Sequence, residues 1–264
     1  MGFELIERNI YCLRLPFMDI FTSVFLVRAE EGDLLFDCGS SDADGLTILS
    51  ALGELGANTD RLKYLFISHA HGDHAGGVDA LTKAMPHLTV LAGSDAILKG
   101  HPSISVQRIE DGQLLLSCLT VTAIPGHTAD SVSLLDNRSR VLISGDCLQQ
   151  YGVFGSGAWG VNITLPREYL SAIRKLEQMD IASILTAHDF HPLGQLAIGP
   201  EAVAKTLDAC RHPLSMLARL IEDCPTATDS EIARQFTDCG LPTLGEWVVT
   251  ALRASEFRAS GEEL

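Results

Sequence analysis

Four side chains that can bind a metal ion lie within six residues of one short segment, FISHAHGDHAGG, which spans residues 66–77. They are His69, His71, Asp73 and His74. Neutral imidazoles and carboxylates are ligands that zinc, iron and manganese accept. On an extended segment residues two apart share a face, so His69 and His71 could bind one metal. Asp73 and His74, on the turn into a helix, would then face a second metal, and the segment predicts two adjacent metal sites.

Three further ligand-type residues each follow an apolar run: His127 in AIPGHT, Asp146 in LISGDC and His188 in ILTAHD. Alone, the turn histidine His127 is a weak indication, and an aspartate at a strand end such as Asp146 is usually a cap or turn residue. Together with the first segment they place ligands at the ends of four strands, which could meet at one edge of a sheet. Their joint occurrence, in this order, indicates a metal centre.

The apolar patterning predicts the strands and helices that must position these residues. The expected strands are Ile10–Leu15, Ser23–Arg28, Gly32–Asp37, Tyr64–Ser68, Thr89–Ala92, Leu114–Ile124, Ser131–Leu135, Val141–Ser144 and Ser183–Thr186. The expected helices are Asp44–Leu55, Ala75–Ala84 and Arg167–Gln178, and the chain is helical after Pro200. This order predicts a layered core of strands and helices with a helical appendage. We expect a metal-binding catalytic domain over residues 1–200 and a helical C-terminal extension over residues 201–264.

Composition narrows the function. The formal net charge is −15, from 34 acidic and 19 basic residues, so the average field repels polyanions and nucleic acid is an unfavourable partner. The seven cysteines form no CxxC pair, which argues against a disulfide framework and a zinc ribbon. The first residues do not resemble a secretory signal, and no stretch resembles a membrane span. A cytoplasmic protein without a membrane partner is expected.

The ligand-type residues resemble the pattern of the metallo-β-lactamase superfamily, in which HxHxDH is followed by GHT, GD and a late AH. The resemblance covers about residues 3–195. It implies an α+β fold, the αββα sandwich, with the metal site at one edge of two sheets. It also implies the ligands: His69, His71 and His127 for the first metal, Asp73, His74 and His188 for the second, and Asp146 as the bridge. Asp37, in LFDCG, would support the site without binding metal.

Such a centre implies two divalent metal ions, zinc first, with iron or manganese as alternatives. Two cations can share a water and lower its pKa, which makes hydroxide available at neutral pH without a serine or cysteine nucleophile. Asp73 and Asp146 would take part in proton transfer. The expected function is hydrolysis of an ester, thioester or lactone of a small molecule by a metal-bridging hydroxide.

Other functions stay open. The same metals could serve a phosphodiesterase or nuclease, or one iron could serve a persulfide dioxygenase. A non-enzymatic scaffold is disfavoured because each of the seven ligand positions holds a histidine or an aspartate. The ligand set is most similar to glyoxalase II, N-acyl homoserine lactonases and ribonuclease Z-type enzymes. Asp146 stands in the bridging position, whereas many lactamases place a cysteine in the second site, and His71 stands where diiron oxygen-reducing members carry Glu.

The segment after Asp146 interleaves glycines with Tyr151, Phe154 and Trp159. It is interpreted either as a substrate-facing loop whose aromatic residues line the pocket, or as a packed connection. The helical tail could shape the substrate pocket, and its alternative role is assembly of a homo-oligomer.

Overall fold

The computed structural model describes residues 1–150, 160–190, 193–239 and 243–255. The chain forms two compact units. The first unit contains residues 1–123 and 132–145, and the second contains residues 124–131 and 146–264. Neither unit ends at residue 200, so the division into residues 1–200 and 201–264 stays a prediction.

The first unit is built on a sheet in which seven strands pair in their sequence order. The strands are β1 (Glu4–Glu7), β2 (Ile10–Phe17), β3 (Ile20–Arg28), β4 (Asp33–Phe36), β5 (Leu62–Ile67), β6 (Thr89–Ala92) and β7 (Val106–Arg108). Pairing is antiparallel from β1 to β4 and parallel from β4 to β7. Parallel neighbours need crossover connections, and α1 (Asp42–Glu54) and α3 (Val78–Ala84) are two helices in those connections.

One face of this sheet carries the apolar core of the first unit. Alternate residues of the central strands, such as Leu26 and Leu65, pack in one buried cluster with Ile48 of α1 and Leu81 of α3. The period of two along the strands and the helical spacing of the apolar residues therefore meet on the same surface. This agreement explains why the strands and helices of this region could be predicted from the pattern.

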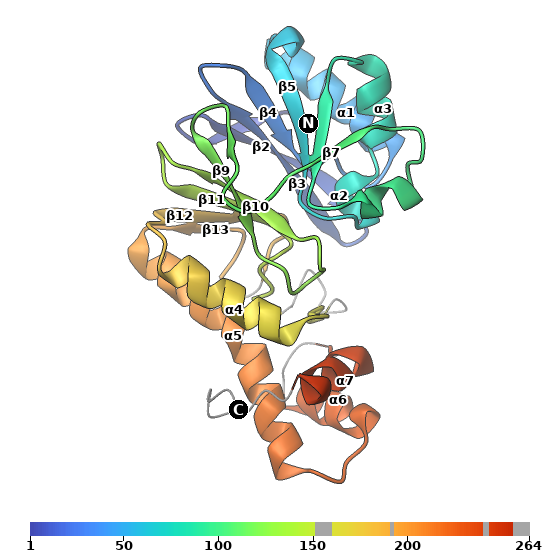
Figure 1. The fold of residues 1–264 in the computed structure, drawn as a ribbon, viewed down its shortest axis with the longest axis vertical. Helices are drawn as coiled ribbons and strands as arrows, with labels where there is room; N and C mark the ends of the chain where they lie inside the picture. The colour runs from blue at the N-terminus through green and yellow to red at the C-terminus, as the bar shows by residue number, and fades with distance from the viewer. Residues whose placement is uncertain (151–159, 191–192, 240–242, 256–264) are drawn as a thin grey trace. The chain divides into compact units, whose positions relative to one another are not determined.

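A second set of strands in the first unit is antiparallel, in the order β11-β10-β9-β8. These strands are β8 (Leu114–Leu115), β9 (Leu119–Ala123), β10 (Val132–Asp136) and β11 (Val141–Gly145) (Figure 1). The Val132 N–H donates to the Ser68 carbonyl over 2.9 Å, so β10 starts beside the end of β5. Phe36 and Phe66 stack with ring centroids 5.0 Å apart on the neighbouring strands β4 and β5.

The expected strand Leu114–Ile124 is wrong as a single element. Leu116 and Ser117 have positive φ angles of 46° and 53°, and the chain reverses there so that β8 pairs with β9. Positive φ is uncommon for residues with a Cβ, and neither residue is the glycine or asparagine that most readily adopts it. Both arms of the hairpin are apolar, and the run therefore gave no sign of the turn.

The second unit is mainly helical. It contains α4 (Pro166–Glu177), β12 (Ser183–Thr186), β13 (Leu196–Ile198), α5 (Pro200–Asp223), α6 (Asp229–Asp238) and α7 (Glu246–Ala254). The helical tail is thus confirmed as three helices within the described residues. Thr228 and Glu231 form a capping box at the start of α6. Among the helices described, none is long and apolar enough to cross a lipid bilayer.

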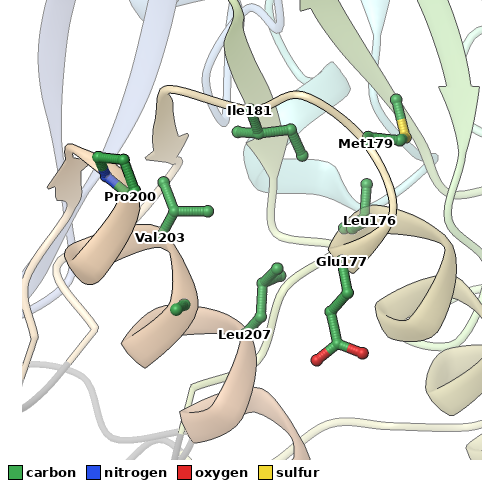
Figure 2. A pocket seen from close by; sticks show the side chains of 8 residues that line it. Leu176, Glu177, Met179, Ile181, Pro200, Val203 and Leu207 are labelled. Carbon is green, nitrogen blue, oxygen red and sulfur yellow. The ribbon is translucent and has the colours of Figure 1, made fainter.

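An apolar hollow of about 320 Å³ lies between the end of α4 and the first half of α5. Figure 2 shows Leu176 and Met179 on one side and Val203 and Leu207 on the other. The carboxylate of Glu177, at its rim, pairs with Arg211 of α5. An ion pair thus joins the two helices beside this hollow.

The expected helix Ala75–Ala84 is interrupted after the metal-binding segment. The short helix α2 (Gly72–Ala75) ends and α3 begins at Val78, with Gly76 and Gly77 between them. A Cβ on Gly76 would lie 2.2 Å from the carbonyl carbon of Ser40, and one on Gly77 would lie 2.3 Å from the Cys38 carbonyl oxygen. The two glycines let the segment that follows β4 lie directly against the ligand-bearing turn.

Substitution of Gly76 tests this close approach. We expect Gly76→Ala to lower the free energy of unfolding by about 1–3 kcal/mol, because the backbone at Ser40 must move. The matched control is Gly53→Ala in α1, where an added Cβ meets nothing within 4 Å, and a gain of about 0.5–1 kcal/mol is expected. Denaturant unfolding of the metal-free proteins measures both. Equal stability of Gly76→Ala and wild type would contradict the tight contact.

Candidate metal centre

His69 and His71 lie just after β5 in the first unit. His69 is buried, and His71 is partly exposed. The Nε2 of His69 lies 2.9 Å from the Nδ1 of His71, and the Nδ1 of His69 lies 3.0 Å from the hydroxyl oxygen of Ser68. That hydroxyl donates to Asp37, so it accepts from His69, which puts the proton of His69 on Nδ1 and lets Nε2 act as a metal ligand.

Asp73 and His74 lie on α2, one turn further on. The Nδ1 of the buried His74 lies 2.8 Å from Oδ2 of Asp37, and its Nε2 lies 3.3 Å from Oδ2 of Asp73. Burial lowers the pKa of His74, but the carboxylates of Asp73 and Asp37 outweigh that effect and raise the pKa well above its usual range. The anionic surroundings therefore favour positive charge at this imidazole, as expected where a cation is to bind.

Asp37 holds both parts of this arrangement. The buried carboxylate accepts the Ser68 N–H over 2.8 Å, the Ser68 O–H over 2.9 Å and the His74 Nδ1–H over 2.8 Å. Its backbone is in the left-handed region, with a φ of 62°. Three donors satisfy a buried charge that would otherwise be costly. Asp37 thus fixes His74 directly and His69 through Ser68.

In the second unit, His127 projects from the Pro-Gly turn that precedes it. Its Nδ1 donates to the carbonyl of Asn162 over 2.7 Å, and its own carbonyl accepts from the Thr164 hydroxyl over 2.9 Å. Because a carbonyl only accepts, the proton sits on Nδ1, and Nε2 can act as a metal ligand. Main-chain groups thus hold His127 in the same tautomer as His69 and His74.

Asp146 and His188 complete the ligand-type residues of the second unit. Oδ2 of Asp146 lies 3.3 Å from the Nε2 of His127, and Oδ1 lies 3.6 Å from the Nε2 of His188. Each carboxylate oxygen therefore faces a different histidine. Oδ1 is buried and accepts no hydrogen bond from the described residues, a state that a bound cation would relieve.

These donors fit divalent metal ions. Within the part of the chain that the structure describes, the histidines and acidic residues that gather closely enough to hold a metal ion all belong to the predicted set. Their donor atoms are imidazole Nε2 or Nδ1 nitrogens and carboxylate oxygens, which suit zinc, iron or manganese. Zinc itself is not distinguished by this donor set.

The sequence motifs did not point to Ser68 or Asn162, although both orient a histidine. Ser68 lies inside the motif and could have been found by asking what holds His69. Asn162 acts through its main-chain carbonyl, which no side-chain pattern reveals. Tyr151, Phe154 and Trp159, interpreted as pocket residues, lie outside the described residues.

The fold and these residues agree with a known family. The model of the metallo-beta-lactamase superfamily matches residues 18–188, and the chain belongs to this superfamily. The expected α+β class with C-terminal helices is thereby confirmed. Members of this superfamily bind divalent metals.

Individual relatives support the same family. The lactamase-like protein ptaB of Pestalotiopsis fici is 30% identical over 170 residues, which cover 63% of this chain and 50% of the relative. An atrochrysone carboxyl ACP thioesterase of Aspergillus fumigatus is 30% identical over 161 residues, covering 60% and 47%. The chain thus spans about half the length of these curated relatives. The solved metallo-beta-lactamase of Pontibacter korlensis is 21% identical with a TM-score of 0.59, covering 80% of this chain and 98% of that one, and it shows the fold alone.

Substitution of Asp37 tests its role in holding the histidines. All three of its partners are donors, so the amide nitrogen of Asp37→Asn would face a donor. We expect metal affinity to fall about 10- to 100-fold and the free energy of unfolding of the metal-free protein to fall by about 1–3 kcal/mol. Competition with a chromophoric chelator and denaturant unfolding measure these changes.

The matched control is Asp44→Asn. Asp44 also accepts two hydrogen bonds, from the Ser40 N–H and O–H, and it contacts no predicted ligand. We expect it to lose stability with unchanged metal affinity. Asp37→Asn with the metal affinity of wild type would show that Asp37 does not support the site.

Proposed function

We propose that the chain is a dinuclear metal hydrolase that cleaves thioesters or related esters of a small, partly apolar acyl group. In this assignment the metals are held by His69, His71 and His127 in one triad and by Asp73, His74 and His188 in the other, with Asp146 as the bridge. Zinc is the preferred metal.

The observation that carries this proposal is the position of Asp146. Its two oxygens face His127 and His188 separately, at 3.3 and 3.6 Å, and these histidines belong to different triads of the assignment. A carboxylate that bound one metal would not need a different histidine beside each oxygen. The paired arrangement of His69 with His71, and of Asp73 with His74, supports the same division in the first unit.

When bound, two divalent cations would supply a hydroxide at neutral pH and polarise the attacked carbonyl. The chain's own residues would hold and orient that chemistry. Asp37 and the Asn162 carbonyl fix the proton on Nδ1 of His74 and His127, so each Nε2 stays a ligand. Asp73, which is partly exposed, can accept a proton from the attacking water and return it to the leaving group.

Charge and relatives favour a carbonyl substrate. The net charge is −15, and residues 145–166, which follow the bridging position, contain no lysine or arginine. A phosphodiester would need such cations to pair with its own charge. A thioesterase is among the matched relatives. We therefore place a thioester of a small molecule first, an oxygen ester or lactone next, and a phosphodiester last.

The surroundings proposed for this enzyme are cytoplasmic. The seven cysteines all lie in the described part of the chain and form no disulfide there, which suits a reducing compartment. The partner is a small-molecule substrate. A homo-oligomer formed through the C-terminal helices stays a prediction.

Metal content tests the dinuclear assignment. We expect two metal equivalents per chain by elemental analysis. Loss of a residue that only supports a metal ligand typically lowers metal affinity about 10- to 100-fold. Asp146→Ala should lower it by more, because it removes a ligand shared by both ions. Asp136→Asn is the control, since Asp136 is a buried aspartate that pairs with Arg138 and not with a ligand. One tightly held iron per chain with no second metal would replace this assignment by the dioxygenase.

Reaction class is tested with a substrate panel. Metal-loaded protein should hydrolyse acyl thioesters and carboxylic esters faster than bis(p-nitrophenyl) phosphate or single-stranded RNA. The reason is that residues 145–166 contain no lysine or arginine that could pair with a phosphate. The measurement is kcat/KM for each substrate. A preference for phosphodiesters of about tenfold, equivalent to about 1.4 kcal/mol in transition-state stabilisation, would overturn the acyl assignment.

A further inference from the structure

Gln149 is a buried amide three residues after Asp146, and the proposed chemistry does not use it. Its side chain is enclosed, with 1% of the residue exposed. The amide nitrogen donates to the main-chain carbonyl of Asp146 over 2.8 Å, and the amide oxygen accepts the Asn162 N–H over 3.3 Å. One orientation of the amide satisfies both partners, since a flipped amide would place like groups together.

These contacts connect the two ligand-type residues that face each other. Asn162 donates its main-chain N–H to the Gln149 amide oxygen, and its main-chain carbonyl accepts from Nδ1 of His127. A chain of three hydrogen bonds therefore runs from the main chain of Asp146 through Gln149 and Asn162 to the His127 ring. A displacement of the Asp146 main chain would therefore shift the His127 ring, because each of these hydrogen bonds is part of one buried network.

Tyr169 of α4 anchors this chain. Its hydroxyl accepts the Gln149 N–H over 2.8 Å, and the hydroxyl is fully buried beside the thiol of Cys210 in α5. The same residue packs under the turn that carries His127, since a Cβ on Gly126 would lie 2.4 Å from the Tyr169 Cβ. Burial raises the pKa of Tyr169 well above its usual range, so the phenol stays neutral.

We propose that Gln149, anchored by Tyr169, is a positioning residue that sets the separation of the Asp146 carboxylate from the His127 ring and thereby the affinity of the metal that His127 binds. This inference rests on the proposed dinuclear centre. Gln149 is not one of the proposed ligands, and its effect passes through the main-chain groups of Asp146 and Asn162. Through Tyr169 of α4 and Cys210 of α5 it links both proposed ligands to these two helices, which thereby act on the centre without contributing a ligand.

The test uses the full chain with Gln149→Met, which keeps the length of the side chain but removes both hydrogen bonds. Tyr169→Phe removes the acceptor of the Gln149 N–H and keeps the ring. Ser133→Ala is the control, because Ser133 is a buried residue of β10 whose hydroxyl donates to the main-chain carbonyl of Thr122 and to no predicted ligand. Zinc affinity is measured by chelator competition, the ligand field by the visible spectrum after cobalt substitution, and stability by melting of the metal-free proteins.

We expect Gln149→Met to weaken one of the two zinc sites about 10- to 100-fold, with a changed cobalt spectrum, and to spare the other site. Tyr169→Phe should shift the same site in the same direction by less, and Ser133→Ala should keep both affinities. Wild-type affinity at both sites in Gln149→Met, whatever its melting temperature, would overturn the positioning role. Wild-type protein that binds no zinc would instead overturn the proposed function, and this role with it.

Discussion

The buried carboxylate of Asp37 is the interaction on which the metal-binding part of the first unit depends. A charge with no exposed surface is tolerated only when donors surround it, and Asp37 has three, two from Ser68 and one from His74. These donors come from the segment after β5 and from α2, while Asp37 itself follows β4. One carboxylate therefore joins three segments that the chain brings together only on folding. The main-chain bond from the Cys38 N–H to the His74 carbonyl, at 2.8 Å, strengthens the same junction.

In the second unit, main-chain groups and not a buried carboxylate orient the ligand-type residues. His127 is oriented by the Asn162 carbonyl, and Asp146 is fixed through its own carbonyl by Gln149. In both units an acceptor binds the Nδ1–H of the histidine, which leaves Nε2 on the opposite side of the ring to face a cation. Different sequences thus reach one tautomeric state, because the requirement is for an acceptor and not for a particular residue.

This difference explains how far the sequence could predict the molecule. The ligand-type residues and most strands followed from residue type and period, since a motif such as HxHxDH and an alternating strand are written in side chains. Asp37 could be predicted only through the resemblance to a family. Asn162 could not be predicted, because a carbonyl acceptor is available at every residue. The break at Gly76 and the hairpin at Leu116 were missed because both depend on contacts or backbone angles that apolar patterning does not encode.

The two ways of holding the histidines also make the proposed triads unequal. A carboxylate behind an imidazole increases the basicity of its other nitrogen more than a neutral carbonyl does, since it stabilises the positive charge that the ring gains as a ligand. His74, backed by Asp37, is therefore the stronger donor, and His127, backed by the Asn162 carbonyl, is the weaker one. His69 is intermediate in donor strength, because its partner Ser68 is itself a donor to Asp37.

Asp73 adds a second negative charge beside His74. In the proposed assignment, the triad of Asp73, His74 and His188 would thus be richer in electron donation and would hold a cation more firmly. The proposed triad of His69, His71 and His127 has imidazoles only and would leave more of a cation's charge to act on a substrate carbonyl.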